Sequence, residues 1–260
     1  MGGTFKFNDS GQVIGEYGTI SGTIPADHGF IYSNGTFTDL SDPSALRDTY
    51  VKGINDSGQV VGYYISKSGG EFGFIYSNGT YTNLNDPSAS ANVSAQGINA
   101  SGEVIGFYNT SSGGGRGFIY SNGTYTDLTD PLASRGNTWV QAINDPGQVL
   151  GYYFDSSGIE HGYIYSNGTY TDLTDPAGTK GTFVVAINNS GQVIGNYSDS
   201  GGTEHGFIYS NGTFTDLTGP SGTTQTVASA INDSGNVVGY YIDSGGTEHG
   251  FIYSNGTLPI

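Results

Sequence analysis

Histidine beside an acidic residue recurs along the chain, and this pattern could carry chemistry. The pairs are Asp27-His28, Glu160-His161, Glu204-His205 and Glu248-His249. An imidazole next to a carboxylate can act as an acid and base or can hold a metal. Adjacent residues of a strand point to opposite faces, however, and the pairs lie too far apart in sequence for a compact metal motif. We therefore expect no metal and no other cofactor, and we assign His28, His161, His205 and His249 a structural role.

A structural histidine needs a hydrogen-bond partner. In WD-repeat propellers a recurring histidine near a blade turn bonds to a recurring aspartate. By this analogy the predicted partners are Asp9, Asp145 and Asp233, with Asn189 in the remaining histidine-bearing unit.

A second acidic series consists of Asp-Pro dipeptides at Asp42, Asp86, Asp130 and Asp175. Asp-Pro favours turn initiation, so a turn-forming role is preferred over calcium binding. The sequence has no calcium-binding loop, nucleophile elbow, phosphate-binding loop or His-Glu-x-x-His motif. No motif therefore indicates a specific enzyme class, and a non-enzymatic role is favoured while catalysis stays open.

These residues belong to a tandem repeat. Ile-Tyr-Ser-Asn-Gly-Thr begins at residues 31, 75, 119, 164, 208 and 252, and it alternates with a block typified by Ile54-Asn-Asp-Ser-Gly-Gln-Val-Val-Gly62. Each unit reads as two β-hairpins. Asn-Gly between alternating β-prone residues predicts type I′ turns, which need positive φ at both central positions. The six Asn-Gly pairs also match the N-glycosylation pattern, but the turn explains the glycine as well.

Six units of about 44 residues with four strands each predict an all-β, six-bladed β-propeller. We expect one domain over 1–260, with repeat units at approximately 1–46, 47–90, 91–135, 136–179, 180–223 and 224–260. A linear solenoid is the alternative. It is disfavoured because the end units have no polar caps of different composition.

The repeated blocks resemble the HAF repeat family of bacterial, extracellular repeat proteins, which is named for a His-Ala-Phe tripeptide. The resemblance covers essentially the whole chain and is carried by His28-Gly29-Phe30, His161-Gly162-Tyr163, His205-Gly206-Phe207 and His249-Gly250-Phe251. Two units depart from it, with Phe72 and Arg116 in place of histidine. The resemblance implies a propeller-like array and an extracellular or cell-envelope location, and it implies no reaction.

The connectors between units differ most from copy to copy, and a rigid repeat usually places recognition in such segments. One column near them holds Tyr50, Ser94, Trp139, Phe183 and Val227, and cationic residues gather nearby. Aromatic faces and cationic donors suit glycans, especially acidic ones. The predicted ligand-binding residues, at or near these variable inter-blade loops, are Tyr50, Trp139, Phe183, Arg47, Lys52, Arg135 and Lys180. The alternative is that the aromatic residues begin the next strand and pack in the core.

The composition of the chain disfavours some classes of binding partner. The formal charge of −16 opposes binding to nucleic acid and to anionic membranes. There is no membrane-length apolar run, Met1-Gly2-Gly3 leads into strand-like residues without a signal-peptide pattern, and there are no cysteines.

These features favour a monomeric, non-catalytic extracellular propeller that serves as a binding module or a scaffold, with a glycan or a cell-surface protein as the expected partner. One alternative is a polysaccharide lyase or hydrolase with its site at the mouth of the central channel. Another is a duplicated or engineered scaffold with no ligand.

Overall fold

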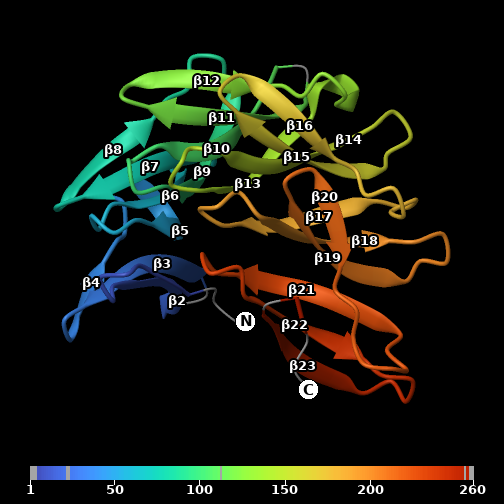
Figure 1. Ribbon diagram of the computed structural model, residues 1–260. Coiled ribbons are helices and arrows are strands. Elements are labelled where there is room, and N and C mark those ends of the chain that lie inside the picture. Colours follow the sequence, from blue (N-terminus) through green and yellow to red (C-terminus); the bar gives the residue numbers. More distant parts are fainter. Residues whose placement is uncertain (1–4, 22–23, 112, 255, 258–260) are drawn as a thin grey trace. The chain divides into compact units, whose positions relative to one another are not determined.

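The computed structural model describes residues 5–21, 24–111, 113–254 and 256–257. The chain divides into two units, Met1–Thr129 (unit 1) and Asp130–Ile260 (unit 2), which are described separately. Figure 1 shows strands throughout both units, and the described residues contain no α-helix. No helix among them is long and apolar enough to cross a membrane.

In unit 1 each strand pairs antiparallel with the next in a series of meanders (Figure 1). The first comprises β1 (Lys6–Phe7), β2 (Val13–Ser21), β3 (Ile24–Ser33) and β4 (Thr36–Asp39). The second comprises β5 (Ala45–Ile54), β6 (Val60–Ser66), β7 (Glu71–Ser77) and β8 (Thr80–Leu84). The third comprises β9 (Ala91–Ile98), β10 (Val104–Asn109), β11 (Gly115–Ser121) and β12 (Thr124–Leu128).

Unit 2 repeats this pattern after a single 3-10 turn, η1 (Ser134–Gly136). One meander comprises β13 (Thr138–Ile143), β14 (Val149–Phe154), β15 (Glu160–Ser166) and β16 (Thr169–Leu173). The next comprises β17 (Thr182–Ile187), β18 (Val193–Ser198), β19 (Glu204–Ser210) and β20 (Thr213–Asp216). The described part of the last comprises β21 (Gln225–Ile231), β22 (Val237–Ile242) and β23 (Glu248–Tyr253).

The Asn-Gly pairs form the tight hairpins that the sequence predicts. Asn78 and Gly79, between β7 and β8, have φ of 49° and 82°. Positive φ at both central residues is the requirement of a type I′ turn, so the prediction is confirmed there. The same holds at Asn34, Asn122, Asn167 and Asn211. Asn255, the sixth predicted position, lies outside the described residues.

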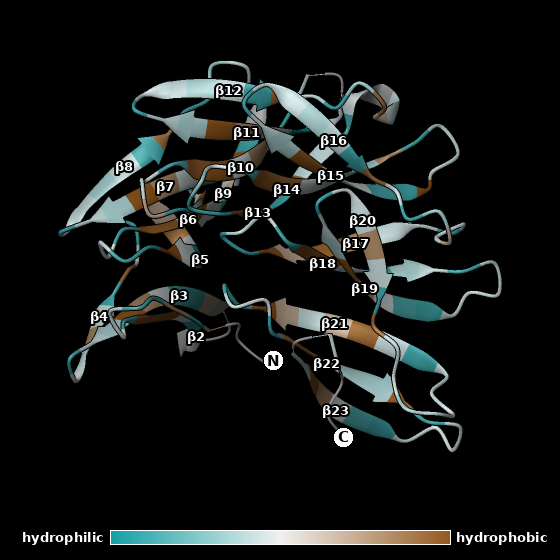
Figure 2. Cartoon of the chain, viewed as in Figure 1, coloured by the Kyte–Doolittle hydropathy of each residue, from teal (hydrophilic) through white to brown (hydrophobic). Residues whose placement is uncertain are grey.

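Within each unit the apolar core lies between successive meanders. Ile14, Ile31 and Leu40 of the first meander pack against Val51, Val60 and Phe74 of the second. In unit 2 the same columns repeat, with Leu150, Ile164 and Leu173 against Val184 and Val193. The brown stretches along the middle strands in Figure 2 mark these apolar runs. Consecutive residues of β6, β10, β14 and β18 are buried, so these middle strands are covered on both faces.

A recurring glycine allows the first two strands of a meander to approach closely. A Cβ added to Gly62 would lie 1.9 Å from the carbonyl oxygen of Tyr50. At the matching Gly106 it would lie 2.3 Å from the carbonyl oxygen of Ser94. Glycine is required at both positions, because a side chain here would overlap the backbone of the neighbouring strand.

Candidate functional site

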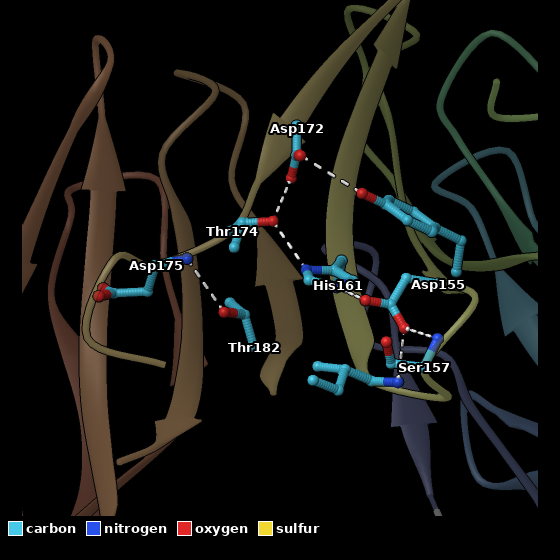
Figure 3. A network of polar contacts seen from close by, with 9 residues as sticks. Asp155, Ser157, His161, Asp172, Thr174, Asp175 and Thr182 are labelled. Carbon is cyan, nitrogen blue, oxygen red and sulfur yellow. Dashed lines mark hydrogen bonds and ion pairs between the residues drawn. The ribbon is translucent and has the colours of Figure 1, made fainter. Parts of the chain in front are cut away.

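His161, His205 and His249 take part in hydrogen bonds that hold the turn before their strand. In Figure 3, His161 of β15 lies between Asp155 and Thr174. Its Nε2 is 3.2 Å from Asp155 Oδ2 and its Nδ1 is 2.8 Å from Thr174 Oγ1. The Thr174 hydroxyl donates to Asp172, which also accepts from the hydroxyl of Tyr153. The Tyr153 ring stacks on the imidazole at a centroid distance of 5.2 Å. These contacts support a structural role.

The predicted histidine partners are wrong. His205 and His249 contact Asp199 and Asp243 at 3.2 and 2.9 Å, so the partner is the aspartate six residues earlier. The aspartate lies in the hairpin turn that leads into the strand of the histidine. This turn places the carboxylate beside the imidazole ring. His28 has no such aspartate, because its Nε2 contacts Thr19 and its Nδ1 contacts Ser41.

The lowered pKa of these turn aspartates reflects their hydrogen bonds. The backbone N–H of Ile159 and the ring of His161 lower the pKa of Asp155. The ring of His249 lowers the pKa of Asp243, with help from the backbone N–H of Thr247. The ionised aspartate therefore stabilises its turn.

The residues that were expected to partner the histidines lie in other turns. The backbone N–H of Asp145 donates to Asn189 Oδ1, and that of Asn189 donates to Asp233 Oδ1, each at 2.9 Å. In unit 1 the backbone N–H of Asp9 donates to Asp56 Oδ1 at 2.8 Å. These bonds join the first turn of one meander to the first turn of the next. Their direction along the chain is the same each time.

The Asp-Pro dipeptides form turns, as predicted. Asp175 Oδ1 accepts from the backbone N–H of Ala177 at 2.8 Å, and the Asp175 N–H donates to Thr182 (Figure 3). Asp42, Asp86 and Asp130 accept in the same way from the residue two positions on. Each of these aspartates is buried in its own turn.

The predicted aromatic ligand residues lie in strands rather than in connectors. Tyr50 is in β5, Trp139 in β13 and Phe183 in β17, and all are half-buried. The Trp139 ring stacks on Tyr152 at 6.4 Å. This location agrees with the packing alternative, and a role in ligand binding stays a prediction.

The predicted cationic residues differ in their surroundings. Lys52 lies in β5 with Tyr50, and its Nζ is 5.3 Å from the Tyr50 ring centroid. Lys180 is exposed in unit 2, and its backbone N–H donates to the backbone carbonyl oxygen of Ser198. The side chains of Arg47 and Arg135 lie outside the described residues.

A hollow in unit 1 with chemically varied walls lies among strands β5, β6, β7, β9 and β10. Its cavity volume is about 350 Å³. It is lined by carboxylate, amide, hydroxyl, ammonium and aromatic groups, namely Lys52, Tyr63, Glu71, Asn92, Ser94, Gln96, Phe107 and Asn109. A concave site with aromatic walls and several convergent polar groups is a typical binding site for a small molecule.

The position of the hollow follows from one column of the repeat. This column holds Tyr50 in β5, Trp139 in β13 and Phe183 in β17, but Ser94 in β9. Ser94 pairs across the sheet with Phe107, as Tyr50 pairs with Tyr63. Its small side chain is buried at the base of the hollow, where its hydroxyl accepts from the Gln96 amide at 2.8 Å. The space that a ring takes elsewhere is therefore left open beside Ser94.

The two charged groups of the hollow, Lys52 and Glu71, differ in their surroundings. Burial raises the pKa of Glu71 above its ordinary value, and burial also raises the pKa of Tyr63 to about 12. Lys52 Nζ lies 3.2 Å from Glu16 Oε1, so its charge is already paired. The Glu71 backbone N–H donates to Asn92 Oδ1 at 3.1 Å. Asn92 has φ of 53°, an unusual conformation for a residue other than glycine.

Sequence reasoning identified Lys52 but missed other groups that line the hollow, including Glu71 and Asn92. The signal was present in the column that contains Ser94, because a small residue among aromatic ones indicates an unfilled position. Only the aromatic residues of that column were predicted to bind a ligand.

A second hollow, in unit 2, is lined by the connector 218–224 with His205, Asp216 and Gln225, and its volume is about 360 Å³. Gly219 stands where the other connectors have a buried aspartate. The described lining groups are mainly hydroxyls and include no aromatic residue other than His205. It therefore has fewer kinds of contact for a ligand than the hollow beside Ser94.

Comparison with known proteins identifies the fold. No protein-family model and no curated protein matches this chain. Among solved structures, the β-propeller domain of the Trilobed protease from Pyrococcus furiosus matches over 99% of this chain and 84% of its own, with 9% identity and a TM-score of 0.65. The chain has a β-propeller fold.

Other solved structures match with similar coverage of this chain. A prolyl endopeptidase structure matches with a TM-score of 0.67 and 10% identity. The match covers 99% of this chain and 41% of the endopeptidase chain. The fucose-recognising lectin of Aleuria aurantia, a six-bladed β-propeller, has a TM-score of 0.44 at 11% identity, with 96% of this chain and 90% of the lectin covered. At such identities the likeness to solved propellers concerns the fold, and the function must be argued from the site.

Proposed function

We propose that this protein is a non-catalytic carbohydrate-binding propeller whose binding site is the hollow beside Ser94. The observation that supports this most is the set of groups that line it. Tyr63 and Phe107 give aromatic surface, which can contact the C–H face of a sugar ring. Asn92, Gln96 and Asn109 have side-chain amides that both donate and accept. Sugar hydroxyls also donate and accept, so the two sets of groups are complementary.

The lining favours binding over hydrolysis. Glycoside hydrolysis generally uses two carboxyl groups, on either side of the bond to be cleaved. Among the described residues that line the hollow, Glu71 is the one carboxylic acid. A single carboxylate can accept a hydrogen bond from a sugar hydroxyl, but it cannot act as both the acid and the nucleophile or base of the hydrolysis. The proposal is therefore recognition of a glycan without cleavage.

We propose the architecture, location, family and oligomeric state of the protein together with this function. Six blades in a closed ring, a bacterial extracellular or envelope location, and membership of the HAF repeat family are supported by the repeated sequence blocks. A monomer is the proposed state.

A glycan array tests the proposal with two matched variants. Glu71→Gln removes the negative charge of the acceptor in the hollow, whereas Glu160→Gln makes the same change in the same column in unit 2, where Phe183 holds the position of Ser94. We expect the wild type and Glu160→Gln to bind the same glycans and Glu71→Gln to lose most of the signal. Absence of signal for the wild type with every glycan would refute the proposal, as would full retention of binding by Glu71→Gln.

A further inference from the structure

The repeat contains a filled counterpart of the hollow. One repeat earlier, residues with the same places in their strands surround the side chain of Tyr50. Asp27 corresponds to Glu71, Asp48 to Asn92, and Tyr63 to Phe107. One hydrogen bond confirms the match, because the Asp27 N–H donates to Asp48 Oδ1 at 3.1 Å just as the Glu71 N–H donates to Asn92 Oδ1 at 3.1 Å.

In the filled position the occupant is a hydroxylated ring. The Tyr50 ring lies 5.0 Å from the Tyr63 ring, and its hydroxyl donates to Asp27 Oδ2 at 3.2 Å. The Lys52 ammonium lies over the same ring. The protein thus provides an aromatic neighbour, a carboxylate acceptor and a third polar group for a ring that carries a hydroxyl.

The open position keeps these contacts and lacks the ring. Phe107 is the aromatic neighbour of Ser94, Glu71 is the carboxylate, and Gln96 stands in the place of Lys52. The carboxylate of Glu71 receives no hydrogen bond from any described residue. Burial raises its pKa, which shows that its charge is poorly solvated. A hydroxyl donor would relieve this cost.

We infer that the hollow takes a neutral, hydroxylated six-membered ring in the place that the Tyr50 phenol fills in the preceding repeat, with a ring hydroxyl donating to Glu71. This inference rests on the proposed function, which it narrows to neutral sugars. The acidic sugars that the basic residues suggested are disfavoured, because Lys52 is already paired with Glu16 while Glu71 would repel a second carboxylate.

The substitution that tests this is Ser94→Tyr, which places in the hollow the residue that the preceding repeat already accommodates. The matched control is Ser111→Tyr, the same change at an exposed turn of the same meander. Thermal unfolding of both variants shows whether each is folded. Calorimetric titration then uses the methyl glycosides of glucose, galactose, mannose and fucose, methyl glucuronide as an acidic sugar, and p-cresol as a minimal hydroxylated ring.

The inference predicts that at least one neutral glycoside binds the wild type and Ser111→Tyr equally and binds folded Ser94→Tyr at least about tenfold more weakly. Methyl glucuronide should bind more weakly than methyl glucoside. If neutral glycosides bind and Ser94→Tyr does not weaken them, the protein is a sugar binder but the inference is wrong. If p-cresol alone binds, and Ser94→Tyr abolishes it, the sugar function fails while the ring-binding position stands. If no probe binds, both are overturned.

Discussion

Two neighbouring places in unit 1 share one framework and differ in their contents. Around Tyr50 the ring, its hydroxyl and the carboxylate of Asp27 form a closed set of contacts. Around Ser94 the corresponding strands and the same backbone hydrogen bond remain, but a hollow of about 350 Å³ takes the place of the ring. The strands and the backbone hydrogen bond therefore form with or without the ring, and the column of Tyr50 and Ser94 is where a ring is present at the first position and missing at the second.

The largest effect should come from damage to the shared framework. Gly62→Ala and Gly106→Ala each place a Cβ within 2.5 Å of a carbonyl oxygen of the adjacent strand, at 1.9 and 2.3 Å. We expect each variant to lose about 4 kcal/mol or more of unfolding free energy, since the strands must separate. Urea unfolding measures this. Gly18→Ala is the control, because its nearest neighbour would be Asp27 Oδ1 at an ordinary 3.5 Å. Strong destabilisation by only one of the two substitutions would show that the frameworks differ.

Opening the filled position should have the next largest effect. Tyr50→Ser removes a packed ring and leaves Asp27 without its donor, so we expect a loss of about 3 kcal/mol. Added p-cresol should restore part of that stability by filling the new cavity. Tyr50→Phe, which removes only the hydroxyl, should lose about 1 kcal/mol. A Tyr50→Ser protein as stable as the wild type would mean that the ring does not support this position.

The open position should respond to pH through Glu71. Its raised pKa means that it takes up a proton at a higher pH than an ordinary glutamate. The ionised form is the better acceptor for a sugar hydroxyl, so affinity should be full above the raised pKa and should fall as the pH drops through it. Titrations with the strongest neutral glycoside between about pH 4 and pH 8 check this. Glu71→Gln should bind weakly with a flat profile, and a wild-type profile equally flat would exclude Glu71 as the acceptor.

The smallest effect is expected at Lys52, which contacts both positions. Lys52→Gln introduces the residue that the next repeat has there, Gln96. The Lys52–Glu16 pair is partly exposed, so its loss should cost under about 1 kcal/mol. Affinity for a neutral glycoside should change little, because the ammonium is already paired. A large loss of affinity, above all for methyl glucuronide, would instead indicate an acidic ligand.

Much of the fold was predictable because the turns and close strand contacts of each repeat are determined by residues within that repeat. The Asn-Gly turns follow from the need for positive φ, and the glycine column of Gly62 and Gly106 follows from the close approach of the backbones. The Asp-Pro turns are local as well, since Asp175 bonds to a residue two positions away. The β-propeller fold, which the solved structures support, agrees with this periodic pattern.

The site was less predictable because it depends on contacts between elements. The partner of His161 is Asp155, which the hairpin brings back over the ring, whereas the analogy pointed to Asp145 in another turn. The hollow exists because Ser94 replaces the aromatic ring that other members of its column carry. Ser94 indicates a site only once the structure shows that its cross-strand neighbour Phe107 and the Glu71 carboxylate line the same hollow.

The most direct measurement is the crystal structure of the protein with the neutral methyl glycoside that titrates most strongly. The account predicts a sugar ring in the hollow beside Ser94, next to Phe107, with a hydroxyl within hydrogen-bond distance of the Glu71 carboxylate. A ring bound elsewhere, such as along the connector 218–224 or against Trp139, with the hollow beside Ser94 lacking sugar, would contradict it.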